Sequence, residues 1–301
     1  MSESLNESLN ESLNESNLRA PSSGPRARQR RRQRGISLVE VAIALTIIAL
    51  TTVGLVASLA QQAEQRRIAE SRSTLNQARD ALLSFVTLNG RLPCPATAAS
   101  AGHEAIAANA GGRMSCTLQA GFLPAVTLGI SDLDAGGWLT NGWRDGANPG
   151  GTLPRVVRYA VTSLAGNWAD ALTSPSLGPF APNTAMRANQ VQTAAIANGE
   201  AMFVCASAAG IQAAGANRCG TVANQLSGSA AAVVWTLGAN GNDPAAYSVD
   251  EQQNANMAVP RVVISRPYAP PGASGGVFDD LVVWLPYATV AERLFLTGFV
   301  Q

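Results

Sequence analysis

The sequence predicts an α+β protein in which one long N-terminal helix packs on a mainly antiparallel β-sheet head. Two observations predict this fold: residues 36–88 carry a helical pattern without proline, and residues 89–301 hold five short β-branched runs that are not separated by regular helices. Strands without helical crossovers favour antiparallel pairing. The composition, 47% hydrophobic and 14% charged, excludes a disordered chain, because disorder needs low hydrophobicity and high charge.

Residues 1–35 are expected to form a disordered basic leader that is removed. The stretch opens with repeats of Glu-Ser-Leu-Asn, and it holds seven of the 21 basic residues, all of which are arginine. Seven arginines against four glutamates give this leader a charge of +3, while the whole chain carries only +1. A basic leader on a mildly acidic body is typical of a targeting segment, and direct nucleic-acid binding is not expected.

Residues 36–63 are predicted to be a transmembrane helix. Glu40 is their only charged residue, and the 20 residues 41–60 contain neither a charged nor an amide side chain. A helix of that length covers roughly 30 Å, the thickness of one hydrocarbon core. The preceding arginines place the N-terminal side in the cytoplasm, so the rest of the chain would be exported.

Residues 64–88 are predicted to continue the same helix in amphipathic form. One apolar face is indicated by spacings of three, four and seven residues between Ile68, Leu75, Ala78, Leu82 and Phe85. Asn89-Gly90, with Pro93 beyond, is a helix stop signal.

Residues 89–301 are expected to form a β-rich globular head. The candidate strands are 156–161, 201–205, 231–237, 261–265 and 281–285, and a last short helix is expected at 289–296. Residues 162–200 and 239–258 are expected to be irregular.

The junction Arg34-Gly35-Ile36-Ser37-Leu38-Val39-Glu40 resembles the processing site of type IV prepilins and type II secretion pseudopilins. The resemblance implies that prepilin peptidase, a membrane aspartyl peptidase, cuts between Gly35 and Ile36, and that the new amino group of Ile36 is methylated. Two features depart from the family pattern: Ile36 stands where the family usually has Phe, and the leader is long. An ordinary signal anchor, or a secretory signal cut after Ala60, is the alternative; neither would place an acid at the start of its apolar region.

Glu40 is singled out by its position inside an apolar segment. A carboxylate there costs roughly 2.5–3.5 kcal/mol on insertion scales, so it should have a partner. After cleavage, the α-amine of Ile36 would be charged at neutral pH, since its pKa lies near ~8. The resemblance implies that this amine on one subunit pairs with Glu40 on a neighbour and sets the register of helices in a filament.

Segments of the head are similar to those of large pilin-like proteins. They are residues 89–95, Cys116 with residues 121–124, residues 158–161 and residues 278–284. The resemblance implies a pilin-like fold, a long helix packed on an antiparallel sheet.

Four cysteines lie on the side expected to be exported, where disulfides persist. Three pairings are possible. The local pairs Cys94–Cys116 and Cys205–Cys219 are favoured, because each closes a short loop. A zinc site is the alternative, but no two cysteines have the close spacing that zinc ligands prefer, and the only histidine is His103.

Asp279 and Asp280 are candidate calcium ligands, since calcium prefers oxygen ligands and some pseudopilins hold it in the head. The simpler interpretation makes them turn residues or caps at the start of a strand. No other cofactor is expected. Residues 272–276 match the hydrolase Gly-x-Ser-x-Gly pattern but follow two prolines, and a single histidine makes a catalytic triad improbable, so no catalytic residue and no enzyme is expected.

The sequence thus favours a minor pilin or pseudopilin in a type IV pilus or type II secretion-type filament. Its expected partners are prepilin peptidase, other pilin or pseudopilin subunits and the bacterial inner membrane. The chain would pass once through that membrane, with its head in the periplasm or, once assembled, in an extracellular or periplasmic filament. A head of 213 residues is large for a major subunit. The alternative is a membrane-anchored periplasmic binding or adhesion module that never enters a filament.

Overall fold

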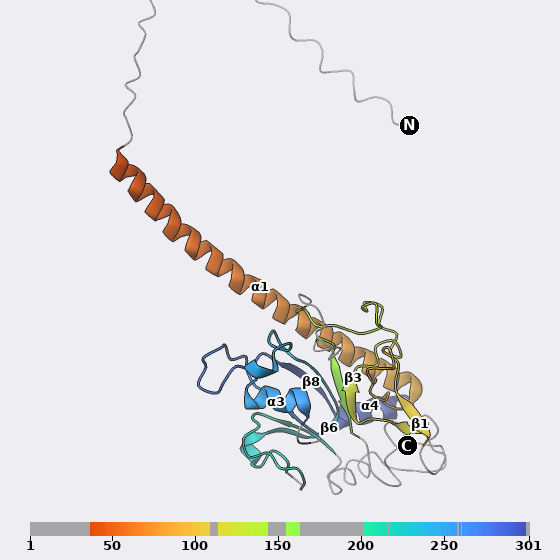
Figure 1. Cartoon of the computed structure of the whole chain (residues 1–301). Helices are drawn as coiled ribbons and strands as arrows, with labels where there is room; N and C mark the ends of the chain where they lie inside the picture. The colour runs from red at the N-terminus through yellow and green to blue at the C-terminus, as the bar shows by residue number, and fades with distance from the viewer. Residues whose placement is uncertain are drawn as a thin grey trace, which may run out of the picture. The chain divides into compact units, whose positions relative to one another are not determined.

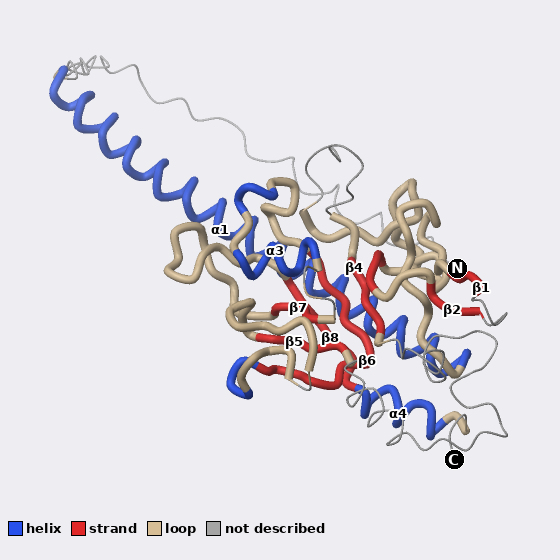
Figure 2. Tube along the Cα trace, turned by 60° about the horizontal axis from the view of Figure 1, so that its bottom comes forward, coloured by secondary structure: helices blue, strands red, loops and turns tan. Residues whose placement is uncertain are grey.

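The computed structural model describes residues 37–108, 114–143, 155–162, 201–215, 217–257, 259 and 261–298; within them, the side chains of 53–61, 108, 114 and 115 are left aside (Figures 1 and 2). The chain divides into two units, Met1–Val56 and Ala57–Gln301. The expected leader, Gly35 and Ile36 lie outside the described residues. So does most of the predicted irregular stretch 162–200.

A single helix of 52 residues, α1 (Leu38–Asn89), confirms the predicted helix to within two residues at each end. It ends where Gly90 adopts a φ of 68°, a conformation that a residue without a Cβ accepts easily. Within the described residues, no helix is both long enough and apolar enough to cross a membrane. The predicted transmembrane span 36–63 is therefore not confirmed.

The strands form two sheets. Their bounds are β1 (Ile106–Ala108), β2 (Met114–Cys116), β3 (Ala120–Phe122), β4 (Arg158–Val161), β5 (Met202–Cys205), β6 (Gln225–Thr236), β7 (Val262–Ile264) and β8 (Leu281–Pro286). A separate pair is made by β1 and β2, while the six-stranded sheet has the order β3-β4-β6-β5-β7, with β8 also paired to β6. All five predicted strands are present, and β1–β3 are additional.

The prediction of an antiparallel sheet was wrong for one pair, since β5 and β7 run parallel and the sheet is mixed. The chain leaves β5, runs through β6 and then passes through a helix that was not predicted, α3 (Val249–Asn256), before entering β7. Two further short 3-10 helices, η2 (Val222–Asn224) and η3 (Pro244–Ala246), also lie in this region. A helix between two strands lets the second strand return in the direction of the first.

Twelve-residue β6 is the central strand. Ala230 pairs with Met202 of β5 and with Pro286 of β8, so these two strands lie at opposite edges of β6. The strand β4 pairs with residues 232–235 of β6. The final helix, α4 (Tyr287–Leu296), follows β8 directly and includes the predicted helix 289–296.

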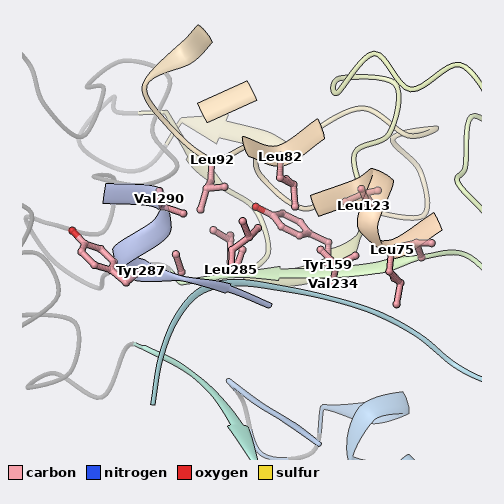
Figure 3. Close-up of a cluster of buried hydrophobic side chains, with 14 of the residues drawn as sticks. Leu75, Leu82, Leu92, Leu123, Tyr159, Val234, Leu285, Tyr287 and Val290 are labelled. Carbon is pink, nitrogen blue, oxygen red and sulfur yellow. The ribbon is translucent and has the colours of Figure 1, made fainter. Parts of the chain in front are cut away.

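The second half of α1 covers one face of the sheet (Figure 3). Leu75, Ala78 and Leu82 of the predicted apolar face are fully buried, and they share a core with Tyr159 of β4 and Leu285 of β8. The other two residues of the predicted apolar face, Ile68 and Phe85, are half-buried. The second half of α1 therefore packs as part of the head, although the head was predicted to begin at residue 89.

The loop at residues 138–143 also packs on α1. The N–H of Gly142 donates to Ser71 Oγ at 2.9 Å, and a Cβ at position 142 would lie 2.7 Å from the Arg67 carbonyl. Only glycine allows this approach. Trp138 and Trp143 of the same loop are 5% and 4% exposed, so their buried rings anchor the loop.

Both local disulfides are confirmed. Cys94 is bonded to Cys116 and Cys205 to Cys219, which leaves no free cysteine. The first joins the segment after α1 to β2, and the second joins the end of β5 to the loop before η2. Short loops closed in this way stabilise a fold chiefly by restricting the unfolded chain.

Candidate functional site

The first turn of α1 holds the described part of the predicted processing motif. Ser37 caps the helix: its hydroxyl accepts from the N–H of Val39 at 3.3 Å, and its carbonyl accepts from the N–H of Val41 at 3.1 Å. Glu40 lies in this first turn, where a carboxylate interacts favourably with the positive end of the helix dipole. An amino group near the helix start would find an acceptor there.

Exposed apolar side chains follow along the described part of α1 up to Leu50. The large apolar side chains in its described part are between 44% and 86% exposed: Leu38, Val39, Val41, Ile43, Leu45, Ile47, Ile48 and Leu50. Exposed apolar patches of this extent mark surfaces that are covered by a membrane or by another protein.

A second candidate site lies in the head, where the two predicted calcium candidates meet a third acid. Glu251 of α3 joins Asp279 and Asp280, and one carboxylate oxygen from each residue lies within 4.8 Å of the others. All three side chains are buried, at 1%, 7% and 4% exposure. Three carboxylates in one buried cluster require compensation, because like charges repel strongly away from water.

Part of the compensation comes from the turn after β6. The N–H of Gly238 donates to Asp280 Oδ1 at 3.2 Å, and the N–H groups of Ala239 and Asn240 donate to Asp279 Oδ2 at 2.9 and 3.3 Å. The interpretation of both aspartates as caps is supported, although they cap a turn that lies 40 residues earlier in the chain. Gly238 is required here, because a Cβ would collide with the Asp279 carboxylate.

The helix α3 supplies most of the remaining partners. Glu251 belongs to a capping box with Ser248, and it also accepts from the amide nitrogen of Asn240 at 3.1 Å and from the N–H of Asp279 at 3.1 Å. Asn254, fully buried, donates to Asp280 Oδ2 at 2.9 Å. One helix thus holds the acid cluster in place from one side.

Within the part of the chain that the structure describes, two acceptor oxygens at this site receive no hydrogen bond. They are Asp279 Oδ1 and Asn240 Oδ1, and both atoms are buried. Burial, and after it the charge of Glu251, raise the pKa of Asp279 to about 6, against the two N–H donors that lower it. Burial also raises the pKa of Asp280 to about 8, in spite of its hydrogen bond with Asn254. At neutral pH, Asp280 is therefore mainly protonated, whereas Asp279 ionises at a higher pH than an aspartate in water.

A cavity of about 350 Å³ opens onto the two aspartates. Its walls include Ile68 and Arg72 of α1, together with Arg266 and Tyr268 from the segment after β7. Arg266 is held by Asp250 at 2.7 Å and lies over the ring of Phe278 at 4.7 Å, so its guanidinium does not pair with the cluster. Asp279 and Asp280 are part of its wall, and Glu251 is not.

The Gly-x-Ser-x-Gly pattern at residues 272–276 forms turns. The N–H of Gly276 donates to the Ala273 carbonyl, and Arg266 Nη2 donates to the carbonyls of Gly275 and Gly276 at 3.0 and 3.2 Å. His103 lies exposed in a loop. The structure therefore does not bring His103 or this turn into the acid cluster.

Glu251, Asn240 and Asn254 were not identified from the sequence. The available signal was Ser248-Val249-Asp250-Glu251, whose Ser-x-x-Glu spacing is typical of a capping box. A helix predicted there would have placed Glu251 and Asn254, three residues apart, on one face.

Comparison with known proteins adds one finding. Residues 30–56 match the family model described as the prokaryotic N-terminal methylation motif. The chain therefore carries a prepilin-type N-terminal motif. The matched region contains the predicted cleavage position and the described first turn with Glu40. No curated protein and no solved structure matches the chain.

The prepilin-like assignment implies processing at the N-terminus by prepilin peptidase and partners of the pilin type. In this prepilin-like chain the two residues of the cleavage site, Gly35 and Ile36, lie outside the described residues. Glu40 and the apolar residues that follow it up to Leu50 are within them, and they are exposed.

Proposed function

We propose that this prepilin-like protein is a non-enzymatic minor pilin or pseudopilin, which enters a type IV pilus or a type II secretion-type filament through its N-terminal helix. The observation that carries the proposal is the match of residues 30–56 to the methylation motif. Processing between Gly35 and Ile36 would leave the apolar helix at the start of the mature chain.

The helix supports a role in assembly. Eight large apolar side chains between Leu38 and Leu50 are exposed, and burying each one fully contributes about 1.5–3 kcal/mol. Before assembly, residues 41–60 would lie in the inner membrane, as their freedom from charged and amide side chains suggests. In a filament, the same surface would be covered by the helices of other subunits.

In this proposal, Glu40 sets the register between the helices of neighbouring subunits. Its place in the first helical turn puts a carboxylate close to the new N-terminus, and an amine of a neighbouring subunit is the partner that it would accept. The large head of residues 89–301 supports a minor or tip subunit over a major one.

Two measurements test the proposal. The intact mass of the protein extracted from membranes should correspond to a chain that begins at methylated Ile36; a chain that keeps residues 1–35 would overturn the processing step. Glu40→Ala should then prevent entry into filaments, measured as loss from sheared filament fractions, while Glu64→Ala, an acid farther along α1, should not. Equal recovery of the Glu40→Ala protein would favour an anchored binding or adhesion module.

A further inference from the structure

Strand β8 has one paired edge and one free edge. It pairs with β6, while β4 and β5 occupy the opposite edge of β6. Among the described residues, no strand or bridge pairs with the outer edge of β8. The other outer strands of the sheet are covered, since Asn254 bonds to both backbone groups of Ile264 in β7, and Ala96 pairs with Phe122 of β3.

The alternation of the ladder identifies the backbone groups on this free edge. The N–H of Thr162, just after β4, donates to the Ala231 carbonyl, so every second residue from Ala231 along β6 directs its backbone groups toward β4. Val282 and Trp284 lie opposite members of this set, so their own N–H and C=O groups point away from β6. In the described part of the chain, no other group bonds to them.

Strand β8 lacks the features with which natural proteins protect such an edge. Its residues 281–286 carry no charge, and their pairing with β6 is regular over residues 281–285. The one proline, Pro286, stands at the last position, directly before α4. Residues 281–284 are half-buried. A flat, apolar edge without charges or bulges is a template for pairing with another chain.

Two arginines of α1 lie on the side of this edge. Arg72 lines the cavity whose wall also includes Leu281, the first residue of β8. Arg79 follows seven residues later, so it lies on nearly the same side of the helix, about 10 Å further along. Arg72 is exposed and Arg79 half-buried, and within the described chain neither forms an ion pair or a hydrogen bond. Their charges are therefore available to a partner.

We propose that the outer edge of β8 binds an extended segment of another protein, which adds one antiparallel strand with acidic residues on the side that faces α1. Residues that are opposite each other on paired strands share a face of the sheet. Leu281 and Val283 pack in the cluster that contains α1, whereas Val282 and Trp284 pack in the cluster on the other face. The bound strand would therefore carry acids opposite the first pair, near the two arginines, and apolar residues opposite the second.

A second copy of the chain fits this edge less well. Antiparallel pairing of β8 with itself would create a two-fold axis and place both α1 helices on the same face of one continuous sheet. The arginines of the two copies would then face each other across the axis, where like charges repel. An acidic strand replaces this repulsion by attraction. The inference goes beyond the proposed function, because it depends neither on processing nor on entry into a filament.

Binding of a synthetic peptide to the full chain in non-ionic detergent is the first test. The probe is a labelled peptide of about seven residues in which glutamate alternates with valine, so that a strand presents one acidic and one apolar face. Its fluorescence anisotropy should saturate at one peptide per chain. A control peptide with lysine in place of glutamate should bind more weakly by about tenfold, because two attractions become repulsions. No saturable binding of the glutamate peptide, or equal binding of both peptides, would overturn the proposal.

Reversal of the two charges tests the role of the arginines. In Arg72→Glu/Arg79→Glu the preference should invert, so that the lysine peptide binds more tightly than the glutamate peptide. Arg66→Glu, at an exposed position of the same helix, should keep the original preference. An unchanged preference in the double variant would show that these arginines do not face the bound strand.

Val282→Pro tests the pairing of backbones. Proline removes the outward N–H and leaves the bonds between β8 and β6, so binding should fall by about tenfold or more, whereas Val282→Ala should bind nearly as well. If Val282→Pro does not fold, methylated peptides test the same step on the unmodified chain. N-methylation of the valines should abolish binding, and N-methylation of the glutamates should not, because only the valine N–H groups face β8. Equal binding by the two methylated peptides, or a dimer without peptide that Val282→Pro disrupts, would refute the proposed occupant.

Discussion

Asn254 completes the open edge of the sheet, and Asn254→Leu tests that role. Its Oδ1 accepts from the N–H of Ile264 at 2.7 Å, and its Nδ2 donates to the Ile264 carbonyl at 2.9 Å and to Asp280 Oδ2 at 2.9 Å. The amide thus pairs with β7 as a neighbouring strand would. All these groups are buried, and leucine has nearly the same size but no polar atom.

The expected loss follows from the three groups that the substitution leaves without partners. Each buried donor or acceptor left unsatisfied costs about 1–3 kcal/mol, so the free energy of unfolding should fall by about 3–9 kcal/mol. Urea unfolding of the full chain, followed by tryptophan fluorescence, measures it. Gln252→Ala, at an exposed position of the same helix, is the control and should change stability by less than about 0.5 kcal/mol. If Asn254→Leu lost no more than the control, the edge of β7 would not depend on this amide.

Three further results are expected. Replacing Cys205 and Cys219 together by serine should lower the stability of the oxidised chain by about 3 kcal/mol in urea unfolding, because their disulfide closes a short loop. The pKa of Asp279 is raised from 3.8 to about 6 in the folded head, so protonated Asp279 favours folding. This stabilisation is fully present below pH 3.8 and is lost as the pH rises through about 6. Asp279→Asn should therefore stabilise the head by about 1–3 kcal/mol at pH 8 and leave it nearly unchanged at pH 4, as unfolding curves at both pH values will show. Gly142→Ala should cost about 1–3 kcal/mol, seen as a lower urea midpoint, because its Cβ meets the Arg67 carbonyl.

The parts of the fold that the sequence predicted are those with local signals. The ends of α1 followed from the Asn89-Gly90 stop and from the start of the apolar run, and both agree with the structure to within two residues. Strands β5, β7 and β8 followed from β-branched runs, and each lies within two residues of its predicted bounds. The local disulfides followed from loop length, which favours neighbouring cysteines.

The parts that could not be predicted depend on pairing at a distance or on an inverted pattern. The parallel pairing of β5 with β7 joins residues almost 60 positions apart, so no local pattern indicates it. The helix α3 has no apolar stripe, because its buried residues are Asp250, Glu251, Gln253 and Asn254. Hydrophobic periodicity therefore fails for a helix whose inner face is polar, and a capping box was its only local signal.

The same inverted helix explains how Asp279 and Asp280 lie buried beside a third carboxylate. The aspartates accept from the N–H groups of the turn at residues 238–240. Glu251 is held by its own capping box with Ser248, and it accepts from the N–H of Asp279 at 3.1 Å. Burial and the charge of Glu251 together raise the pKa of Asp279 to about 6, because each added buried charge raises the cost of the others. Capping therefore accounts for the position of all three acids, and the raised pKa is the cost of placing them together.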